Sequence, residues 1–225
     1  MEANPARFDS RKVEIISADS RAIYKCMDIG TAKPSAVEQT LVPHFGLDLV
    51  FPGARFTVYD FKKYALSKIS EIIARGNIPL VVGGTGLYID ALIYDYQFSE
   101  QKNCSDRTGV GSDFLVFGIK WEREKLRERL ALRTEEMFGP ELYEETLQLV
   151  SQYGWENQAM KSNIYQFVWK YMQNEITLEE AKRLNTLDDY HLAKRQMTWF
   201  KRNEEIKWFP LDKIVENVLK CIQYG

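Results

Sequence analysis

Short apolar runs alternate with amphipathic stretches along the first half of the chain. Two runs rich in β-branched residues, 13–18 and 77–82, have the length of buried strands. Between them, Thr57 and Asp60 form the capping-box pattern that opens a helix, and Gly76 ends it. One face of this helix is predicted to be apolar, with Phe61, Ala65, Ile69, Ile72 and Ile73. Strands that alternate with helices predict an α/β fold with a mostly parallel sheet.

The second half of the chain is predicted to be mainly helical. Short strands are expected at 114–121 and 207–209. Mixed Arg and Glu residues in 122–138 predict a solvated helix face with ion pairs, whereas the aromatic residues of 164–172 predict packing in a core. Asn185 is a candidate break in the longest helix. The helical patterns cover 122–138, 141–153, 164–172, 177–199 and 212–224.

Composition limits the compartment and the partners. The 225 residues are 45% hydrophobic and 28% charged, which predicts one sizeable α/β domain with a small appendage. The formal net charge of −2 gives no global attraction for nucleic acid, so any RNA contact must come from a local patch. The three cysteines have no metal or disulfide spacing, and no secretory or membrane-spanning run is present. A cytoplasmic monomer with reduced thiols is expected.

The stretch 19–34 carries the densest candidate chemistry. Asp19 falls where the first strand ends, and the carboxyl ends of parallel strands face the ligand crevice of open sheets. Ser20 and Arg21 follow with a hydroxyl and a fixed cation. A lone aspartate in this place is equally typical of a turn or a helix cap. The glycine-rich turn after the second strand brings Thr85 beside Asp19 if the two strands are neighbours.

A basic run at 191–202 is the best anion site in the sequence. It comprises His191, Lys194, Arg195, Lys201 and Arg202. A solvated helix face is the alternative interpretation, because charged runs at helical spacing are usually exposed. His44, in a segment at 42–53 that is predicted to be a loop, is more typical of a packing residue than of a base or metal ligand.

Three strings of residues are too specific to arise from secondary structure alone. They are Asp-Ser-Arg-x-Ile-Tyr-x-x-Met-Asp-Ile-Gly-Thr-Ala-Lys-Pro at 19–34, Val-Gly-Gly-Thr-Gly-Leu-Tyr at 82–88 and Ala-Lys-Arg-Gln-x-Thr-Trp at 193–199. Together they resemble the signatures of the tRNA dimethylallyltransferases. The resemblance implies a P-loop-NTPase-like α/β fold with a helical C-terminal half. It also implies transfer of a dimethylallyl group from dimethylallyl diphosphate to N6 of adenine 37, next to the tRNA anticodon.

The same resemblance implies roles for particular residues. Asp19 would orient N6 and accept its proton, with Thr85 helping to align it. Arg195 would stabilise the leaving diphosphate, with Lys194 in reserve. Mg²⁺ would bridge the diphosphate oxygens without a protein metal ligand of its own. The residues implied to contact the tRNA are Asp19, Ser20, Arg21, Ala22 and Thr85.

The sequence departs from the family's pattern at three places. The family's phosphate loop, Gly-x-x-x-x-Gly-Lys-Thr, occurs nowhere in the 225 residues. A polar stretch replaces the family's helical insertion, and Tyr190 stands where the family has an arginine. The expected organisation is a first part of the core at 1–96, the polar loop at 97–113 and a second part of the core at 114–225.

These departures leave alternatives open. A catalytically impaired or truncated family member would keep the fold without full turnover, and the 225 residues alone are expected to form a weak catalyst of poor stability. Loss of the basic insertion is expected to weaken tRNA binding. A kinase-like, phosphate-handling enzyme on a related fold would also need the phosphate loop. A pure RNA-binding module fits poorly with the near-neutral charge.

Overall fold

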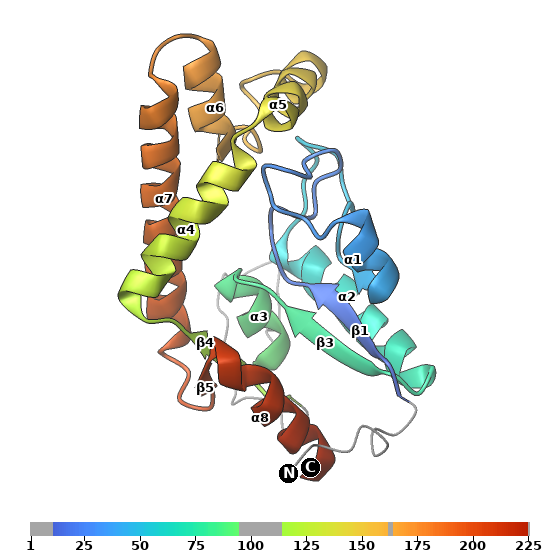
Figure 1. The fold of residues 1–225 in the computed structure, drawn as a ribbon. Coiled ribbons are helices and arrows are strands. Elements are labelled where there is room, and N and C mark those ends of the chain that lie inside the picture. The colour runs from blue at the N-terminus through green and yellow to red at the C-terminus, as the bar shows by residue number, and fades with distance from the viewer. Residues whose placement is uncertain (1–10, 95–113, 162–163, 225) are drawn as a thin grey trace. The chain divides into compact units, whose positions relative to one another are not determined.

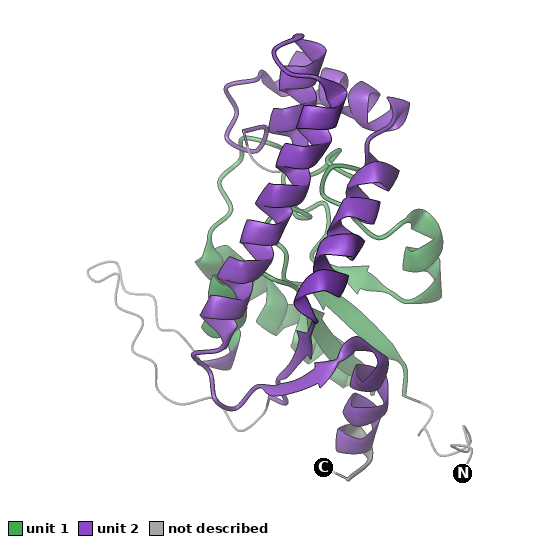
Figure 2. Ribbon diagram, turned by 60° about the vertical axis from the view of Figure 1, so that its left-hand side comes forward, with its two compact units in different colours: residues 1–92, 96–106 green, residues 93–95, 107–225 purple. Residues whose placement is uncertain are grey.

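A computed structural model describes residues 11–94, 114–161 and 164–224 of the chain. The chain divides into two compact units, coloured separately in Figure 2, and each is described by itself. The polar loop predicted at 97–113 lies outside the described residues, as does the start of the chain. The units are Met1–Leu92 with Tyr96–Asp106, and Ile93–Asp95 with Arg107–Gly225.

The first unit is built on a three-stranded parallel sheet with the order β2-β1-β3. Strand β1 (Val13–Ser17) lies in the centre, between β2 (His44–Phe45) and β3 (Ile78–Val82). Strands β1 and β3 pair in register along their whole length, from Val13↔Ile78 to Ser17↔Val82. Parallel strands need crossover connections, which contain α1 (Ala36–Leu41) between β1 and β2 and α2 (Val58–Ala74) between β2 and β3, while α3 (Gly86–Ile93) follows β3 (Figure 1).

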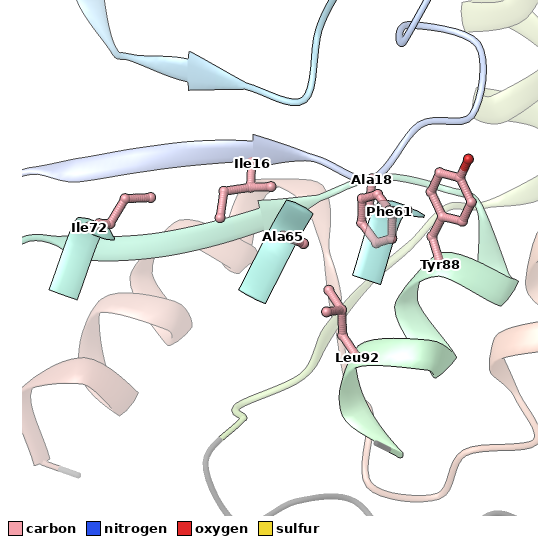
Figure 3. Close-up of a cluster of buried hydrophobic side chains, with 7 residues drawn as sticks. All are labelled: Ile16, Ala18, Phe61, Ala65, Ile72, Tyr88 and Leu92. Carbon is pink, nitrogen blue, oxygen red and sulfur yellow. The ribbon is translucent and has the colours of Figure 1, made fainter. Parts of the chain in front are cut away.

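Helix α2 supplies much of the core of this unit. The rings of Phe61 on α2 and Tyr88 on α3 stack with their centroids 4.1 Å apart, so they tie the two helices together. Thr57 caps α2 with the predicted capping box: its hydroxyl accepts from the amide of Asp60, and the Asp60 carboxylate accepts from the amide of Thr57. The buried cluster, drawn in Figure 3, consists of Ile16, Ala18, Phe61, Ala65, Ile72, Tyr88 and Leu92.

Two details of the first unit differ from the prediction. Ile73 is 58% exposed, because adjacent helical residues point about 100° apart and Ile72 takes the buried side. The segment predicted to be a loop contains β2, which pairs with β1 through Ile15 and Ile16. Helix α1 precedes β2 and begins at a capping box of Ser35. Elements of two and six residues are too short for hydrophobic periodicity to reveal them.

In the part of the second unit that the structure describes, a two-stranded parallel sheet is joined to five helices. Strand β4 (Phe117–Lys120) pairs with β5 (Lys207–Pro210), and helix α8 (Leu211–Tyr224) follows β5 directly. Each helix confirms one that the sequence predicted. Within the described residues, no helix is both long enough and apolar enough to cross a membrane. The other helices are α4 (Arg123–Met137), α5 (Pro140–Tyr153), α6 (Ile164–Met172) and α7 (Leu178–Phe200).

Helices α4 and α7 run antiparallel, and polar contacts join them. The side-chain amide of Asn185 donates to the hydroxyl of Thr134 (3.0 Å), and Arg123 at the start of α4 donates to the hydroxyl of Tyr190 (2.9 Å). The break predicted near Asn185 is wrong, since α7 is continuous through this position. A buried asparagine is tolerated there because its amide finds a partner on the neighbouring helix.

An ion pair between the buried Glu14 and the exposed Arg75, at the opposite end of β1, provides a pH test of this sheet. The carboxylate of Glu14 accepts from Arg75 (2.6 and 3.2 Å) and from the side chain of Asn77 (2.6 Å). These hydrogen bonds, that of Arg75 foremost, hold the pKa of Glu14 below its ordinary value of 4.5. A group with a lowered folded-state pKa stabilises the fold above its unfolded pKa and loses that contribution as the pH falls.

We therefore expect Glu14→Gln to lower the urea midpoint at pH 7, because the neutral amide binds Arg75 less well. The difference from wild type should shrink as the pH falls below about 4.5, where the unfolded state takes up the proton first. Urea unfolding followed at several pH values measures this difference. Glu136→Gln, at an exposed position on α4, is the control. A gap between wild type and Glu14→Gln that does not change with pH would contradict the assignment.

Candidate active site

The carboxyl ends of β1 and β3 meet through backbone hydrogen bonds. The amide of Ala18 donates to the carbonyl of Val82 (2.7 Å), and the amide of Thr85 donates back to the carbonyl of Ala18 (3.3 Å). The two strands are therefore neighbours, as the sequence argument required. Asp19, directly after Ala18, and the turn that carries Thr85 consequently leave the sheet side by side.

Two glycines make this close approach possible. A Cβ atom on Gly83 would lie 2.2 Å from the carbonyl oxygen of Ala18, a distance that no side chain tolerates. On the other side of β1, a Cβ atom on Gly46 would lie 2.7 Å from the carbonyl oxygen of Ser17, and its φ of +82° also favours glycine. The end of β1 is thus enclosed by backbone on both sides.

Thr85 forms hydrogen bonds with Ser20 and not with the Asp19 side chain. Its hydroxyl accepts from the amide of Ser20 (3.0 Å) and donates to the hydroxyl of Ser20 (3.2 Å). Among the described residues, no hydrogen bond joins Thr85 to the Asp19 carboxylate. Thr85 therefore fixes the residue that follows Asp19, and so restrains the aspartate through the backbone.

The Asp19 carboxylate has one oxygen engaged and one open. Oδ1 accepts from the amides of Arg21 (2.7 Å) and Ala22 (3.4 Å), the geometry of an aspartate-stabilised turn. Oδ2 has no hydrogen-bond partner among the described residues. Asp19 can therefore be both a turn residue and a functional residue. The turn orients the carboxylate and leaves one oxygen for another group.

Tyr88 adds a neutral hydroxyl near this carboxylate. Burial raises the pKa of Tyr88 to about 12, and the negative charge of Asp19 acts in the same direction. The phenol is therefore protonated at neutral pH. Since its ring packs on Phe61 in the core, Tyr88 also anchors the turn that carries Thr85 to α2.

The segment that follows Asp19 is held against residues 46–50 like a short pair of strands. The amide of Asp48 donates to the carbonyl of Ala22 (3.2 Å), and the amide of Leu49 donates to that of Ile23 (2.8 Å). An isolated parallel bridge joins Tyr24 to Val50. Ala22 is only 4% exposed in this arrangement, so its implied tRNA contact, which stays a prediction, would fall to its backbone.

Lys33 pins these two segments together, a role that the sequence did not suggest. Its side chain is 3% exposed, and its ammonium group donates to the carbonyl of Tyr24 (2.5 Å) and to the carboxylates of Asp28 and Asp48 (both 2.6 Å). Three donors thus meet three acceptors. A lysine and an aspartate within 19–34 were visible in the sequence, but nothing there indicated that Asp48 would complete the set.

The predicted anion-binding residues lie in the second unit. Lys194 and Arg195 are both exposed and occupy the last third of α7, consistent with a surface accessible to solvent and to ligands alike. His191 is also exposed. His44, by contrast, contacts the carbonyl of Val42 through Nδ1 (2.7 Å), as expected of a packing residue. In the described part of the chain, no group of three His, Cys, Asp or Glu side chains has the arrangement of a metal cage.

Comparison with known proteins gives this geometry its context. A family model described as IPP transferase matches residues 22–113 and 97–203. A tRNA dimethylallyltransferase of Acetivibrio thermocellus is 31% identical over 94% of this chain and 88% of its own length, and one of Alkaliphilus metalliredigens is 32% identical over 99% and 93%.

A solved structure extends the likeness to three dimensions. The crystal structure of tRNA delta(2)-isopentenylpyrophosphate transferase from Staphylococcus epidermidis matches with a TM-score of 0.82 at 28% identity, over 94% of this chain and 91% of that one. The parallel sheet, its strand-end groups and this likeness define a P-loop-like α/β fold. The chain belongs to the IPP transferase family.

The Lys33 network leads to a stability prediction. Lys33→Met should lower the free energy of unfolding by about 1–3 kcal/mol, because the lysine is buried while its partners Asp28 and Asp48 remain 61% and 46% exposed and can regain water. A fully buried pair would cost more, roughly 3–5 kcal/mol. Denaturant unfolding measures the change, with Lys125→Met, at a side chain 65% exposed, as the control. Equal unfolding midpoints for the two variants would refute the role of Lys33.

Proposed function

We propose that this chain transfers a dimethylallyl group from dimethylallyl diphosphate to N6 of adenine 37, next to the anticodon of tRNA. Family membership supports this reaction, and the relatives in the comparisons carry the name tRNA dimethylallyltransferase. The single observation that carries the proposal is the Asp19 carboxylate, fixed at Oδ1 by two backbone amides with Oδ2 open, at the end of a parallel strand.

Asp19 is the general base in this proposal. The N6 nitrogen attacks C1 of the dimethylallyl group, a C–N bond forms, and the bond from C1 to the diphosphate oxygen breaks with its electron pair. The N6 proton passes to Oδ2 of Asp19, which faces no competing partner among the described residues. Thr85 and Ser20 keep the aspartate in place through the backbone, so that the proton acceptor is oriented before the substrate arrives.

Cationic side chains balance the charge of the leaving diphosphate. Lys194 and Arg195 are the candidates, since two exposed cations in succession on α7 match the chemistry of phosphate oxygens. Mg²⁺, when bound with the diphosphate, would supply further positive charge there. Magnesium needs only one or two protein oxygens when phosphates and water complete its shell, and the hydroxyls of Ser20 and Thr85 would be available to hold it.

The setting of the reaction follows from the same resemblance. Asp19, Ser20, Arg21, Ala22 and Thr85 form the proposed contact with the tRNA anticodon region, and the chain is proposed to act as a monomer in the cytoplasm. The alternatives of an impaired family member or a kinase-like enzyme are not favoured. The matched relatives carry the names of transferases, and the match covers most of their length.

Replacement of the proposed base tests this function. Asp19→Asn keeps the Oδ1 hydrogen bonds to the turn but removes the proton acceptor, so the rate of prenyl transfer should fall by roughly 10²–10⁴-fold. Affinity for tRNA should change little. Single-turnover transfer of a radiolabelled dimethylallyl group, with the chain in excess over tRNA, measures this rate. Asp212→Asn, at an exposed position on α8, is the control, and a near-normal rate in Asp19→Asn would rule out general-base catalysis by Asp19.

A further inference from the structure

Three cationic side chains gather around a single tyrosine between α4 and α7. Arg123 donates through Nε to the hydroxyl of Tyr190 (2.9 Å). Arg127, one turn further along α4, lies over the Tyr190 ring with its guanidinium carbon 4.9 Å from the centroid, and the Lys194 ammonium lies 6.0 Å from the same centroid. Two helices thus deliver three positive charges to one aromatic surface, here called the Tyr190 cluster.

The positive charges of the Tyr190 cluster are only weakly balanced by carboxylates. Within the described residues, no carboxylate pairs with Arg123 or Lys194, and Glu124 approaches Arg127 only at 3.7 Å. Elsewhere on α7, by contrast, Arg183 pairs with Glu180 at 2.8 Å. The formal net charge of the whole chain is −2, so the cluster is a local concentration of positive charge and does not reflect the composition.

Tyr190 holds the two arginines in place, whereas the arginines are the groups that would bind an anion. Its hydroxyl fixes one guanidinium by a hydrogen bond, and its ring face holds a second by a cation–π contact. Mutual repulsion of like charges opposes this arrangement, and an anion placed between them would relieve it. A guanidinium presents a fork of N–H donors that matches two phosphate oxygens at once.

We propose that the Tyr190 cluster binds a phosphate group, through Arg123, Arg127 and Lys194. The proposal rests on the proposed function, whose two substrates both carry phosphate: the diphosphate of the prenyl donor and the backbone of the tRNA. It also accounts for the sequence departure at Tyr190, since the arginines of α4 bring positive charge to the position where the family's arginine is missing. The cluster adjoins Arg195 on α7 and extends the anion-binding surface from α7 onto α4.

Direct binding measurements on the full chain test this proposal without requiring turnover. The test variant is the double substitution Arg123→Gln with Arg127→Gln. The matched control, Arg183→Gln with Lys220→Gln, removes two cations that pair with neighbouring glutamates elsewhere in the same unit. The probes are inorganic pyrophosphate, followed by calorimetry, and an anticodon stem-loop RNA, followed by fluorescence anisotropy at several KCl concentrations.

The test variant should lose roughly tenfold or more in affinity for one of the two probes, while the control changes less than about twofold. Loss of pyrophosphate binding, together with a parallel loss in Arg195→Ala, assigns the cluster to the donor diphosphate. Loss of RNA binding, with a salt dependence shallower by roughly 0.7–0.9 per lost contact, assigns it to a tRNA phosphate. Adding Tyr190→Arg to the test variant should recover part of the affinity, because it returns a cation to the same place.

Wild-type affinity of the test variant for both probes, or an equal loss in the control, overturns the proposal. Circular dichroism and thermal unfolding establish that each variant is folded, which is expected because both arginines are exposed. Failure of the proposed function is distinguishable, since it would appear as absent prenyl transfer in the wild type whatever the binding results.

Discussion

The close backbone contact at the carboxyl end of β1 is the constraint on which the candidate site depends. Ala18 exchanges hydrogen bonds with Val82 and Thr85 only because Gly83 has no Cβ atom to occupy the space beside it. The contact sets where the chain turns away from each strand. It therefore fixes the spacing between Asp19 and the Thr85 turn. A reaction at this edge of the sheet would depend on that spacing.

Beyond the strand end, polar contacts hold the chain in addition to the buried side chains of Ile23 and Met27. Lys33 gathers a carbonyl and two carboxylates from segments that would otherwise be independent loops. Three residues in these segments, Cys26, Ala32 and Asp48, adopt positive φ values of 64°, 50° and 54° without being glycine. Such conformations cost roughly 1–2 kcal/mol each, so the surrounding contacts must hold them. Strain of this kind is typical of segments shaped for recognition.

In the second unit, polar residues both support the helices and form a charged surface. In the second unit, the buried contact between Asn185 and Thr134 joins α4 to α7 and lets a long helix continue through a polar residue. The same helix pair presents the Tyr190 cluster near the start of α4, where the charges are exposed. One antiparallel pair therefore serves both as a support and as a candidate phosphate surface.

Local signals in the sequence predicted much of this structure, and long-range partners account for what was missed. The strands β1 and β3, the Thr57 cap of α2 and the adjacency of the two strand ends followed from apolar runs, capping residues and the geometry of parallel sheets. Strand β2 is two residues long and has no pattern of its own. The roles of Lys33 and Asn185 depend on partners 15 and 51 positions away, Asp48 and Thr134, which no local pattern identifies.

We propose above all that the Thr85 hydroxyl, held at the strand end, positions the proposed base Asp19 through Ser20. Single-turnover prenyl transfer by Thr85→Val and Thr85→Ser tests it most directly, because valine keeps the shape of threonine without its hydroxyl, whereas serine keeps the hydroxyl. We predict a transfer rate at least about tenfold lower in Thr85→Val, near-normal transfer in Thr85→Ser, and folded protein in both cases. A Thr85→Val variant that transfers the dimethylallyl group at the wild-type rate would contradict it.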